Sequence, residues 1–224
     1  MGIKLSSLKK KLPGQLYAAL ERDGIVQLRP CQEKALKAGL LEGKNLLVCT
    51  PTASGKTLIA ELAAMSAIVG GRGKAVYVVP LRALASEKYA DFKRRYGELC
   101  RIALSIGDLD GADPYLEGYD LIVTTSEKLD SLIRHRAHWL RQISVLIIDE
   151  IHLLNDASRG PALEMIITLL RQRLPKLQLV ALSATIGNPE TLAAWLEAGL
   201  VLDDWRPVEL RKGIYLDGRL NFYS

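Results

Sequence analysis

Six short apolar runs, alternating with stretches of helical patterning, constrain the fold of this sequence more than any other feature. The runs are continuous, which is typical of strands that helices cover on both faces. They lie at Leu46–Cys49, Ala75–Val79, Ile102–Ser105, Leu121–Thr124, Val145–Ile148 and Leu179–Leu182. The helical stretches are Gln32–Leu41, Lys56–Val69, Arg82–Arg95, Ser126–Arg134, Pro161–Leu174 and Pro189–Leu196. This alternation predicts an α/β fold with a mostly parallel sheet, helices on both faces and a ligand site at the carboxyl ends of the strands.

The segment between the first apolar run and its helix has the composition of a phosphate-binding loop. Gly55 allows the backbone to approach phosphate oxygens, Lys56 supplies positive charge to them, and the Thr57 hydroxyl is suited to Mg²⁺. The usual pattern has glycine where this chain has Thr50, so the motif match is partial. It predicts a site for ATP and Mg²⁺ built from Thr50, Thr52, Ala53, Ser54, Gly55, Lys56 and Thr57.

A second apolar run ends in two acids, Asp149 and Glu150. A carboxylate at this strand tip can reach a Mg²⁺ ion held by Thr57, usually through water. Its neighbour Glu150 can polarise the water that attacks the γ-phosphate. The alternative is a strand end with two solvated acids. Because Lys56 lies upstream in the same α/β pattern, we favour a catalytic set of Lys56, Asp149 and Glu150.

The bulk composition narrows the class of protein only a little. The 224 residues carry a net charge of +5, which suits a polyanionic partner but equally a slightly basic soluble protein. Three scattered cysteines offer neither a disulfide framework nor metal-ligand spacing. No apolar run reaches the length of a membrane span, and the N-terminus has no apolar signal core. We therefore expect a cytoplasmic protein with no membrane partner.

Four motifs in a fixed order make the chain similar to superfamily 2 helicases. Asp149–His152 resembles their DExH box, Ser183–Thr185 resembles motif III, and Arg29–Gln32 resembles the Q motif. Loops without the first glycine are also typical of that superfamily. Further segments resemble its Ski-two-like branch, and within it the archaeal DNA repair helicases related to the polymerase theta helicase domain. These segments are Pro51–Thr57, Val79–Ala85, Thr125–Lys128, Ser158–Gly160, Ser183–Asn188 and Asp204–Val208.

The resemblance implies roles for residues around the nucleotide. Gln32 would recognise the adenine edge, since its amide offers both a donor and an acceptor, whereas the alternative is an exposed helical glutamine without a role. His152 would relay the state of the γ-phosphate toward nucleic acid. Ser183 and Thr185 would hydrogen-bond His152 or Asp149, although small hydroxyl residues after a strand also cap helices.

The resemblance also implies contacts with the phosphates of one DNA strand. Arg82 combines charge with a helix N-terminus, whereas Arg159 could equally form an ion pair that stabilises the fold. Gly107-Asp108 lies in a similar motif, but no contact is assigned to it. Aromatic residues make up 6% of the chain, so base stacking is not expected to be the main device. The expected nucleic-acid contacts are Pro80, Arg82, Thr125, Lys128 and Arg159.

By this resemblance, residues 1–206 would form a first RecA-like lobe. Residues 207–224 would form a linker and the start of a β-hairpin that leads to a second RecA-like lobe absent from this chain. The hairpin is indicated by two short strands around Asp217-Gly218. The expected partners are DNA, as a single strand or a fork, and the second lobe of the same protein, in a nucleoid-associated monomer.

The function implied is that of the N-terminal ATP-binding motor lobe of an ATP-dependent 3′–5′ DNA helicase acting in DNA repair or at stalled replication forks. In that family the arginines that stabilise the γ-phosphate belong to the second lobe, so the chain alone should bind nucleotide but not unwind DNA. An RNA helicase of the same branch and a binding-only module remain alternatives. A small-molecule phosphate-loop kinase is disfavoured, because motif III and Pro80–Leu84 would serve no purpose there.

Overall fold

The structure is a computed structural model that describes residues 3–107, 111–208, 212–216 and 218–223. Asp108 and Asp217, which the sequence places in a motif and in a hairpin turn, lie outside the described residues. In the described part of the chain, no helix is both long enough and apolar enough to cross a membrane.

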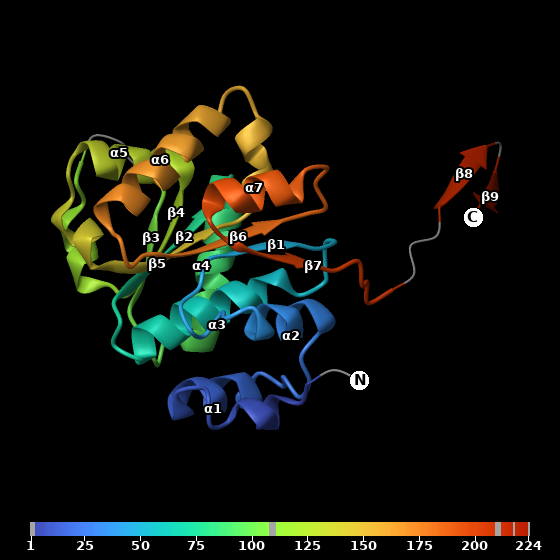
Figure 1. Ribbon diagram of the computed structural model, residues 1–224, viewed down its shortest axis with the longest axis horizontal. Coiled ribbons are helices and arrows are strands. Elements are labelled where there is room, and N and C mark those ends of the chain that lie inside the picture. The colour runs from blue at the N-terminus through green and yellow to red at the C-terminus, as the bar shows by residue number, and fades with distance from the viewer. Residues whose placement is uncertain (1–2, 108–110, 209–211, 217, 224) are drawn as a thin grey trace.

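A seven-stranded sheet forms the centre of the protein (Figure 1). Its strands lie in the order β3-β4-β2-β5-β6-β1-β7, and every neighbouring pair is parallel. Their bounds are β1 (Leu46–Cys49), β2 (Lys74–Val79), β3 (Ile102–Ser105), β4 (Leu121–Thr125), β5 (Ile143–Ile148), β6 (Gln178–Ser183) and β7 (Gly199–Leu202). The predicted α/β fold with a parallel sheet is confirmed, and all six predicted strands are present.

Helices cover both faces of the sheet, as the continuous apolar runs predict (Figure 1). Successive residues of β1 point to opposite faces, so Leu46 and Val48 join one buried core while Leu47 and Cys49 join the other. The first core lies under α1 (Gly14–Arg22), α2 (Pro30–Lys37), α3 (Lys56–Val69) and α4 (Arg82–Tyr96). The second lies under α5 (Ser126–Arg134), α6 (Gly160–Arg173) and α7 (Pro189–Leu196).

Some elements were not expected from the sequence. The helix α1 and the edge strand β7 are additions, and in β7 only Val201 is fully buried. Short 3₁₀ helices are also present as η1 (Leu5–Leu8), η2 (Pro114–Gly118), η3 (His138–Gln142) and η4 (Ile151–Asn155).

The expected hairpin is present near the end of the chain. It consists of β8 (Lys212–Leu216) and β9 (Arg219–Tyr223), which pair antiparallel with Leu216 opposite Arg219. It lies apart from the main body (Figure 1), and its side chains Ile214, Tyr215 and Phe222 are exposed. None of the described hairpin residues belongs to either buried core, so this short hairpin has no core of its own.

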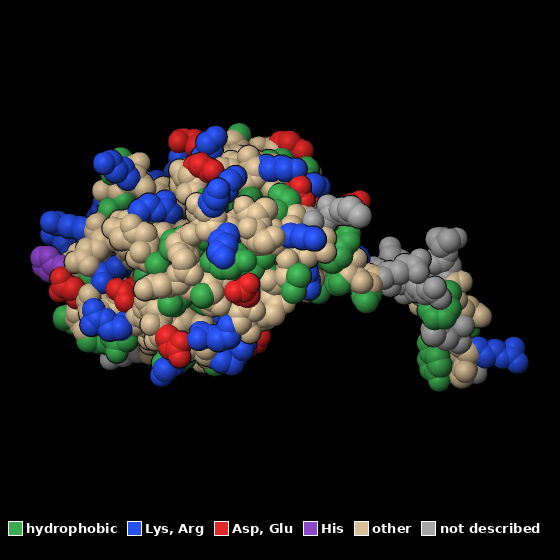
Figure 2. Space-filling view, turned by 90° about the horizontal axis from the view of Figure 1, so that it is seen from below, with side chains coloured by type: hydrophobic (Ala, Val, Ile, Leu, Met, Phe, Trp, Pro, Cys, Tyr) green, Lys and Arg blue, Asp and Glu red, His purple; other side chains and the backbone are tan. Residues whose placement is uncertain are grey.

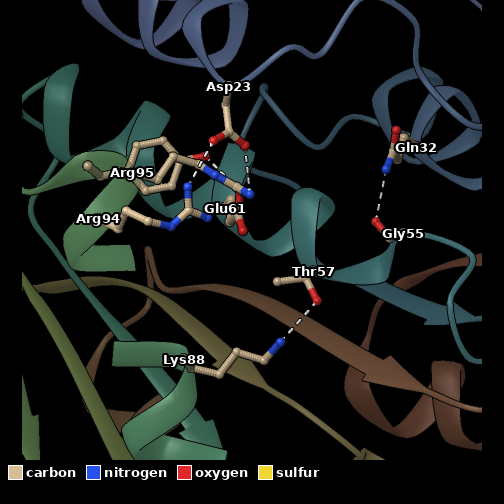
Figure 3. A network of polar contacts seen from close by, with 9 residues as sticks. Asp23, Gln32, Gly55, Thr57, Glu61, Lys88, Arg94 and Arg95 are labelled. Atoms are coloured by element: carbon tan, nitrogen blue, oxygen red, sulfur yellow. Dashed lines mark hydrogen bonds and ion pairs between the residues drawn. The ribbon is translucent and has the colours of Figure 1, made fainter. Parts of the chain in front are cut away.

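A charged network joins three helices beneath the sheet (Figure 3). Glu61 of α3 is only 4% exposed, and its carboxylate accepts hydrogen bonds from the Arg95 guanidinium and, at 2.7 Å, from the Tyr96 hydroxyl. Arg95 of α4 also pairs with Asp23, just beyond α1, at 2.8 Å. Burial raises the pKa of Glu61, while Arg95 and Tyr96 oppose that shift. The network fixes α4 against α3, the helix that follows the phosphate-binding loop.

Replacing Arg95 by methionine should destabilise the fold, because it leaves the Glu61 carboxylate buried without its cation. We expect the free energy of unfolding in urea to fall by about 3–5 kcal/mol. The neighbouring change Arg94→Met is the control, since the Arg94 side chain is 63% exposed and lies 3.4 Å from Asp23. It should cost no more than about 1 kcal/mol. Equal losses in the two variants would contradict the buried role of the Glu61–Arg95 pair.

Candidate nucleotide-binding site

The loop between β1 and α3 is held in shape by buried hydroxyls and by one glycine. Thr50 and Ser54 are buried, and their hydroxyl oxygens lie 2.6 Å apart in a hydrogen bond across the loop. Gly55 has a φ of 100°, in the left-handed region that favours glycine. A Cβ atom there would also lie 2.5 Å from Nε2 of Gln32, so a side chain at this position would displace Gln32 as well as strain the backbone.

Gln32 braces this loop from α2 (Figure 3). Its Oε1 accepts a hydrogen bond from the backbone N–H of Arg29 at 2.8 Å, and its Nε2 donates to the carbonyl of Gly55 at 3.0 Å. The side chain is 4% exposed, so the alternative of an exposed glutamine without a role is wrong. The expected adenine contact would use the same donor and acceptor that here hold the loop. In this conformation Gln32 therefore positions Gly55.

One pocket brings together the loop and the acids that the sequence separates by about a hundred residues. It has a volume of about 460 Å³. Its wall is formed by residues of the loop and by residues of other segments. The loop residues are Thr52, Ala53, Gly55, Lys56 and Thr57, and the other lining residues include Asp149, Glu150, Arg29, Glu87 and Lys88. Within it, Nζ of Lys56 donates to the carbonyl of Thr50 at 3.0 Å. The three residues expected to be catalytic thus share one cavity of a size typical for ligand sites.

Asp149 is oriented by a tyrosine that the sequence did not indicate. The Tyr77 hydroxyl donates to Oδ2 of Asp149 at 2.8 Å, and the backbone N–H of Glu150 donates to Oδ1 at 3.0 Å. Tyr77 pairs with Ile147 across β2 and β5, so Asp149, two residues after Ile147 and just beyond β5, faces the same side. Burial and the Asp149 charge hold the pKa of Tyr77 well above its usual value, which keeps the hydroxyl a donor.

The second acid, Glu150, begins a short chain of contacts toward β6. Its Oε2 lies 3.3 Å from Nδ1 of His152, which in turn lies 3.4 Å from the buried hydroxyl of Ser183. The expected contact between Ser183 and His152 is therefore present. Thr185 is exposed and lines a separate hollow with Lys34 and Asp203.

Three of the expected nucleic-acid contacts lie where strands end and helices begin. Arg82 is exposed at the first position of α4, and Pro80 is half-buried just before it. Thr125 ends β4, and its Oγ1 accepts a hydrogen bond from the N–H of Lys128 at 3.4 Å, which caps α5. Only Arg82 among these presents a charged side chain to solvent.

The structure corrects the expectation for Lys128. This residue is 2% exposed, and its ammonium lies 3.0 Å from Asp113 on a neighbouring segment. The charge is neutralised inside the fold, so a direct phosphate contact does not fit this conformation. Arg159 is half-buried and its N–H donates to Asp156 at 2.9 Å. Its guanidinium forms no ion pair with any described carboxylate, which does not support the alternative of a stabilising ion pair.

A larger hollow, of about 570 Å³, lies near the ends of α5 and α6, away from the phosphate-binding loop. Arg136, Arg141 and Arg173 line it together with leucine and alanine side chains, and it contains neither a carboxylate nor a glycine-rich loop. The pocket with the chemistry of a nucleotide site is therefore the smaller one.

The donors in the smaller pocket are suited to Mg²⁺. Thr57 and Asp149 offer a hydroxyl and a carboxylate, which are hard oxygen ligands. No group of three or more His, Cys, Asp or Glu residues in the described ranges could hold a metal.

Comparison with known proteins defines the class. Residues 29–192 match the DEAD/DEAH box helicase family, and the chain belongs to that family. It is 53% identical over 217 residues to the ATP-dependent DNA helicase Hel308 of Methanocaldococcus jannaschii, covering 94% of this chain and 18% of that protein. It is 49% identical over 208 residues to Hel308 of Pyrococcus horikoshii, covering 93% and 29%. The chain thus spans less than a third of the length of these relatives.

Solved structures agree with the fold. The crystal structure of the DUF1998 helicase MrfA superimposes with a TM-score of 0.72 at 24% identity, over 86% of this chain and 33% of that chain. The structure of MrfA bound to DNA gives a TM-score of 0.73 at 25% identity, over 86% and 30%. The α/β fold is thus the RecA-like helicase fold.

Replacing Tyr77 by phenylalanine should weaken Mg²⁺-dependent binding of ADP, because Asp149 loses the donor that orients it. We expect a loss of roughly fivefold in affinity, equivalent to about 1 kcal/mol, by titration calorimetry with Mg²⁺. Tyr96→Phe is the matched control: it removes a similar hydrogen bond, to Glu61, away from the pocket. That variant should lose stability but keep its ADP affinity. If both variants bind ADP like the wild type, Tyr77 does not orient a metal-binding carboxylate.

Proposed function

We propose that this chain is the N-terminal ATP-binding motor lobe of an ATP-dependent 3′–5′ DNA helicase that acts in DNA repair or at stalled replication forks. The observation that carries the proposal is the single pocket shared by Lys56, Thr57, Asp149 and Glu150. The Hel308 relatives, named as ATP-dependent DNA helicases, support DNA as the substrate. In this proposal residues 1–206 form the motor lobe and residues 207–224 form the connection beyond it.

In this proposal, each residue of the pocket has its own role in phosphoryl transfer. The N–H groups at the start of α3 and the Lys56 ammonium bind phosphate oxygens. Thr57 and Asp149 would hold Mg²⁺, which neutralises charge on the β- and γ-phosphates when bound. Glu150 orients the attacking water and accepts its proton as the bond between the γ-phosphorus and the leaving ADP oxygen breaks. The contact of Glu150 with His152, and that of His152 with Ser183, connect this acid to β6.

The proposed DNA-binding surface is the carboxyl edge of the sheet. Pro80, Arg82, Thr125 and Arg159 lie at or near the ends of strands or the starts of helices there. On the face shown in Figure 2, lysine and arginine side chains are spread among acidic ones and form no single patch. In this proposal a strand of DNA is held by particular contacts at the carboxyl edge, with Arg82 as the exposed charge.

The proposed assembly is a cytoplasmic, nucleoid-associated monomer. DNA would bind as a single strand or a fork, beside a second RecA-like lobe of the same protein. That lobe would supply arginines to the γ-phosphate, which contribute orders of magnitude to the rate of such reactions. The runner-up function is an RNA helicase of the same branch, which would use the same nucleotide pocket.

Lys56→Ala should abolish nucleotide binding without unfolding the protein, because the loop loses its charge toward the phosphates. We expect ADP affinity to fall at least tenfold, as for a charge-assisted contact of about 1.5–3 kcal/mol. Calorimetry gives the affinity, and the urea midpoint reports the fold. Lys93→Ala, an exposed lysine of α4, is the control and should bind like the wild type. Unchanged ADP affinity in Lys56→Ala would rule out this pocket as the nucleotide site.

Arg82→Ala should weaken binding of single-stranded DNA, because one phosphate contact is lost. The slope of log affinity against log salt concentration should become shallower by about 0.7. Fluorescence anisotropy with a labelled oligonucleotide measures both quantities, and Arg94→Ala on the same helix controls for a general loss of charge. Equal effects of the two variants would remove Arg82 from the DNA surface. Tighter binding to an RNA strand of the same sequence would favour the runner-up.

A further inference from the structure

A second lysine lies at the nucleotide pocket, on a helix that the phosphate-binding motif does not include. Lys88 of α4 points its ammonium at the Thr57 hydroxyl, and Nζ donates to Oγ1 at 3.3 Å (Figure 3). The residue is half-buried and lines the same cavity as Lys56. The proposed phosphoryl-transfer steps do not involve this lysine.

The position of this ammonium conflicts with the proposed metal site. Thr57 would bind Mg²⁺ through the same oxygen that now accepts a hydrogen bond from Lys88. Because Mg²⁺ lies about 2.1 Å from its ligands, an ion on Thr57 would sit within roughly 5 Å of the ammonium. Two cations at such a short distance, bound to the same oxygen, repel each other. Lys88 and the metal therefore cannot both occupy Thr57 in this way.

The helix that carries Lys88 is held in place, but the side chain is free to move. Arg95, two turns further along α4, is locked to Glu61 of α3 and to Asp23. The backbone of Lys88 is thereby fixed relative to Thr57, whereas its four-carbon stem can swing the ammonium over several ångströms. Glu87, Asp149 and Glu150 are the other charged groups with side chains on the cavity wall near it, besides Lys56 and Arg29.

We propose that Lys88 is a second phosphate-binding cation of this site: without metal its ammonium bridges the Thr57 hydroxyl and the nucleotide phosphates, and Mg²⁺ displaces it from that hydroxyl when the ion binds. This inference rests on the proposed function of the pocket as a nucleotide site. It gives Lys88 two effects: it supports nucleotide binding without metal, and it competes with the metal for Thr57.

A purely structural lysine would behave differently. If Lys88 only bridged α4 and α3, its removal would lower stability, while the dependence of nucleotide binding on Mg²⁺ would stay the same. The metal dependence of ADP affinity therefore distinguishes the two roles, and it can be measured without any turnover.

The test is ADP binding to Lys88→Met by calorimetry, first in EDTA and then across a series of Mg²⁺ concentrations. In EDTA the variant should bind ADP about tenfold more weakly than the wild type, as for loss of a charge-assisted contact. The Mg²⁺ concentration that gives half of the metal-dependent gain in affinity should fall by about threefold or more, because Mg²⁺ no longer displaces an ammonium. Lys88→Arg, which keeps the charge, should recover most of both properties.

Lys93→Met is the matched control, since it removes a lysine from the exposed side of the same helix. It should leave both measurements unchanged. Wild-type behaviour of Lys88→Met in EDTA and in the Mg²⁺ series would overturn the inference, and so would parallel weakening at every Mg²⁺ concentration. Should Lys88→Met not fold, Lys88→Gln carries the same test with the side-chain length kept.

The Lys56→Ala variant distinguishes a failure of the role of Lys88 from a failure of the nucleotide site itself. If Lys56→Ala abolishes ADP binding while Lys88→Met matches the wild type, the nucleotide site stands and only the role of Lys88 fails. If Lys56→Ala also binds ADP normally, the nucleotide site itself is wrong.

Discussion

The site depends on the parallel register of three neighbouring strands. Cys49 of β1 lies opposite Ser183 of β6, and Ile148 of β5 lies opposite Ala181. Because the strands are parallel and level, the loop after β1, the hydroxyl at the end of β6 and the acids after β5 emerge at one edge. Residues far apart in sequence thus meet without any long excursion of the backbone. A slip of one residue in this register would turn Asp149 away from Tyr77 and out of the pocket.

The helix α4 connects the other parts of the proposed motor. Its first residue, Arg82, is the exposed charge of the proposed DNA surface, its middle carries Lys88 at the candidate nucleotide pocket, and its last turn carries Arg95 in the buried network. Since Glu61 holds Arg95 and belongs to the same helix as Thr57, the nucleotide loop and the DNA edge share one rigid pair of helices. Because the two helices are held together, a displacement of α4 at its Arg82 end would carry α3 and Thr57 with it, which connects the two proposed sites.

The sequence predicts much of this fold because local signals are strong where the backbone is most constrained. The bounds of Leu46–Cys49 and Lys56–Val69 agree with β1 and α3, since Gly55 marks the turn between them sharply. What the sequence does not predict depends on contacts between distant segments. Lys128 lies in the first turn of a predicted helix, where the sequence indicates an exposed side chain. The side chain is buried instead, because its ammonium pairs with Asp113 from another loop. From the sequence, Tyr77 cannot be distinguished from other core aromatic residues. Its role depends on the hydrogen bond that its hydroxyl donates to Asp149, which follows the neighbouring strand β5.

The missing first glycine of the phosphate-binding loop has a structural explanation. Glycine is needed where φ is positive or where a side chain would collide, and Thr50 is not among the residues with positive φ. Its hydroxyl is instead buried, and its oxygen lies 2.6 Å from the hydroxyl oxygen of Ser54 in a hydrogen bond that closes the base of the loop. Gln32 and Arg29 then hold the far side, at Gly55 and at the left-handed Ala53. A loop braced from both sides in this way is preorganised for the proposed phosphates without relying on a flexible residue at its start.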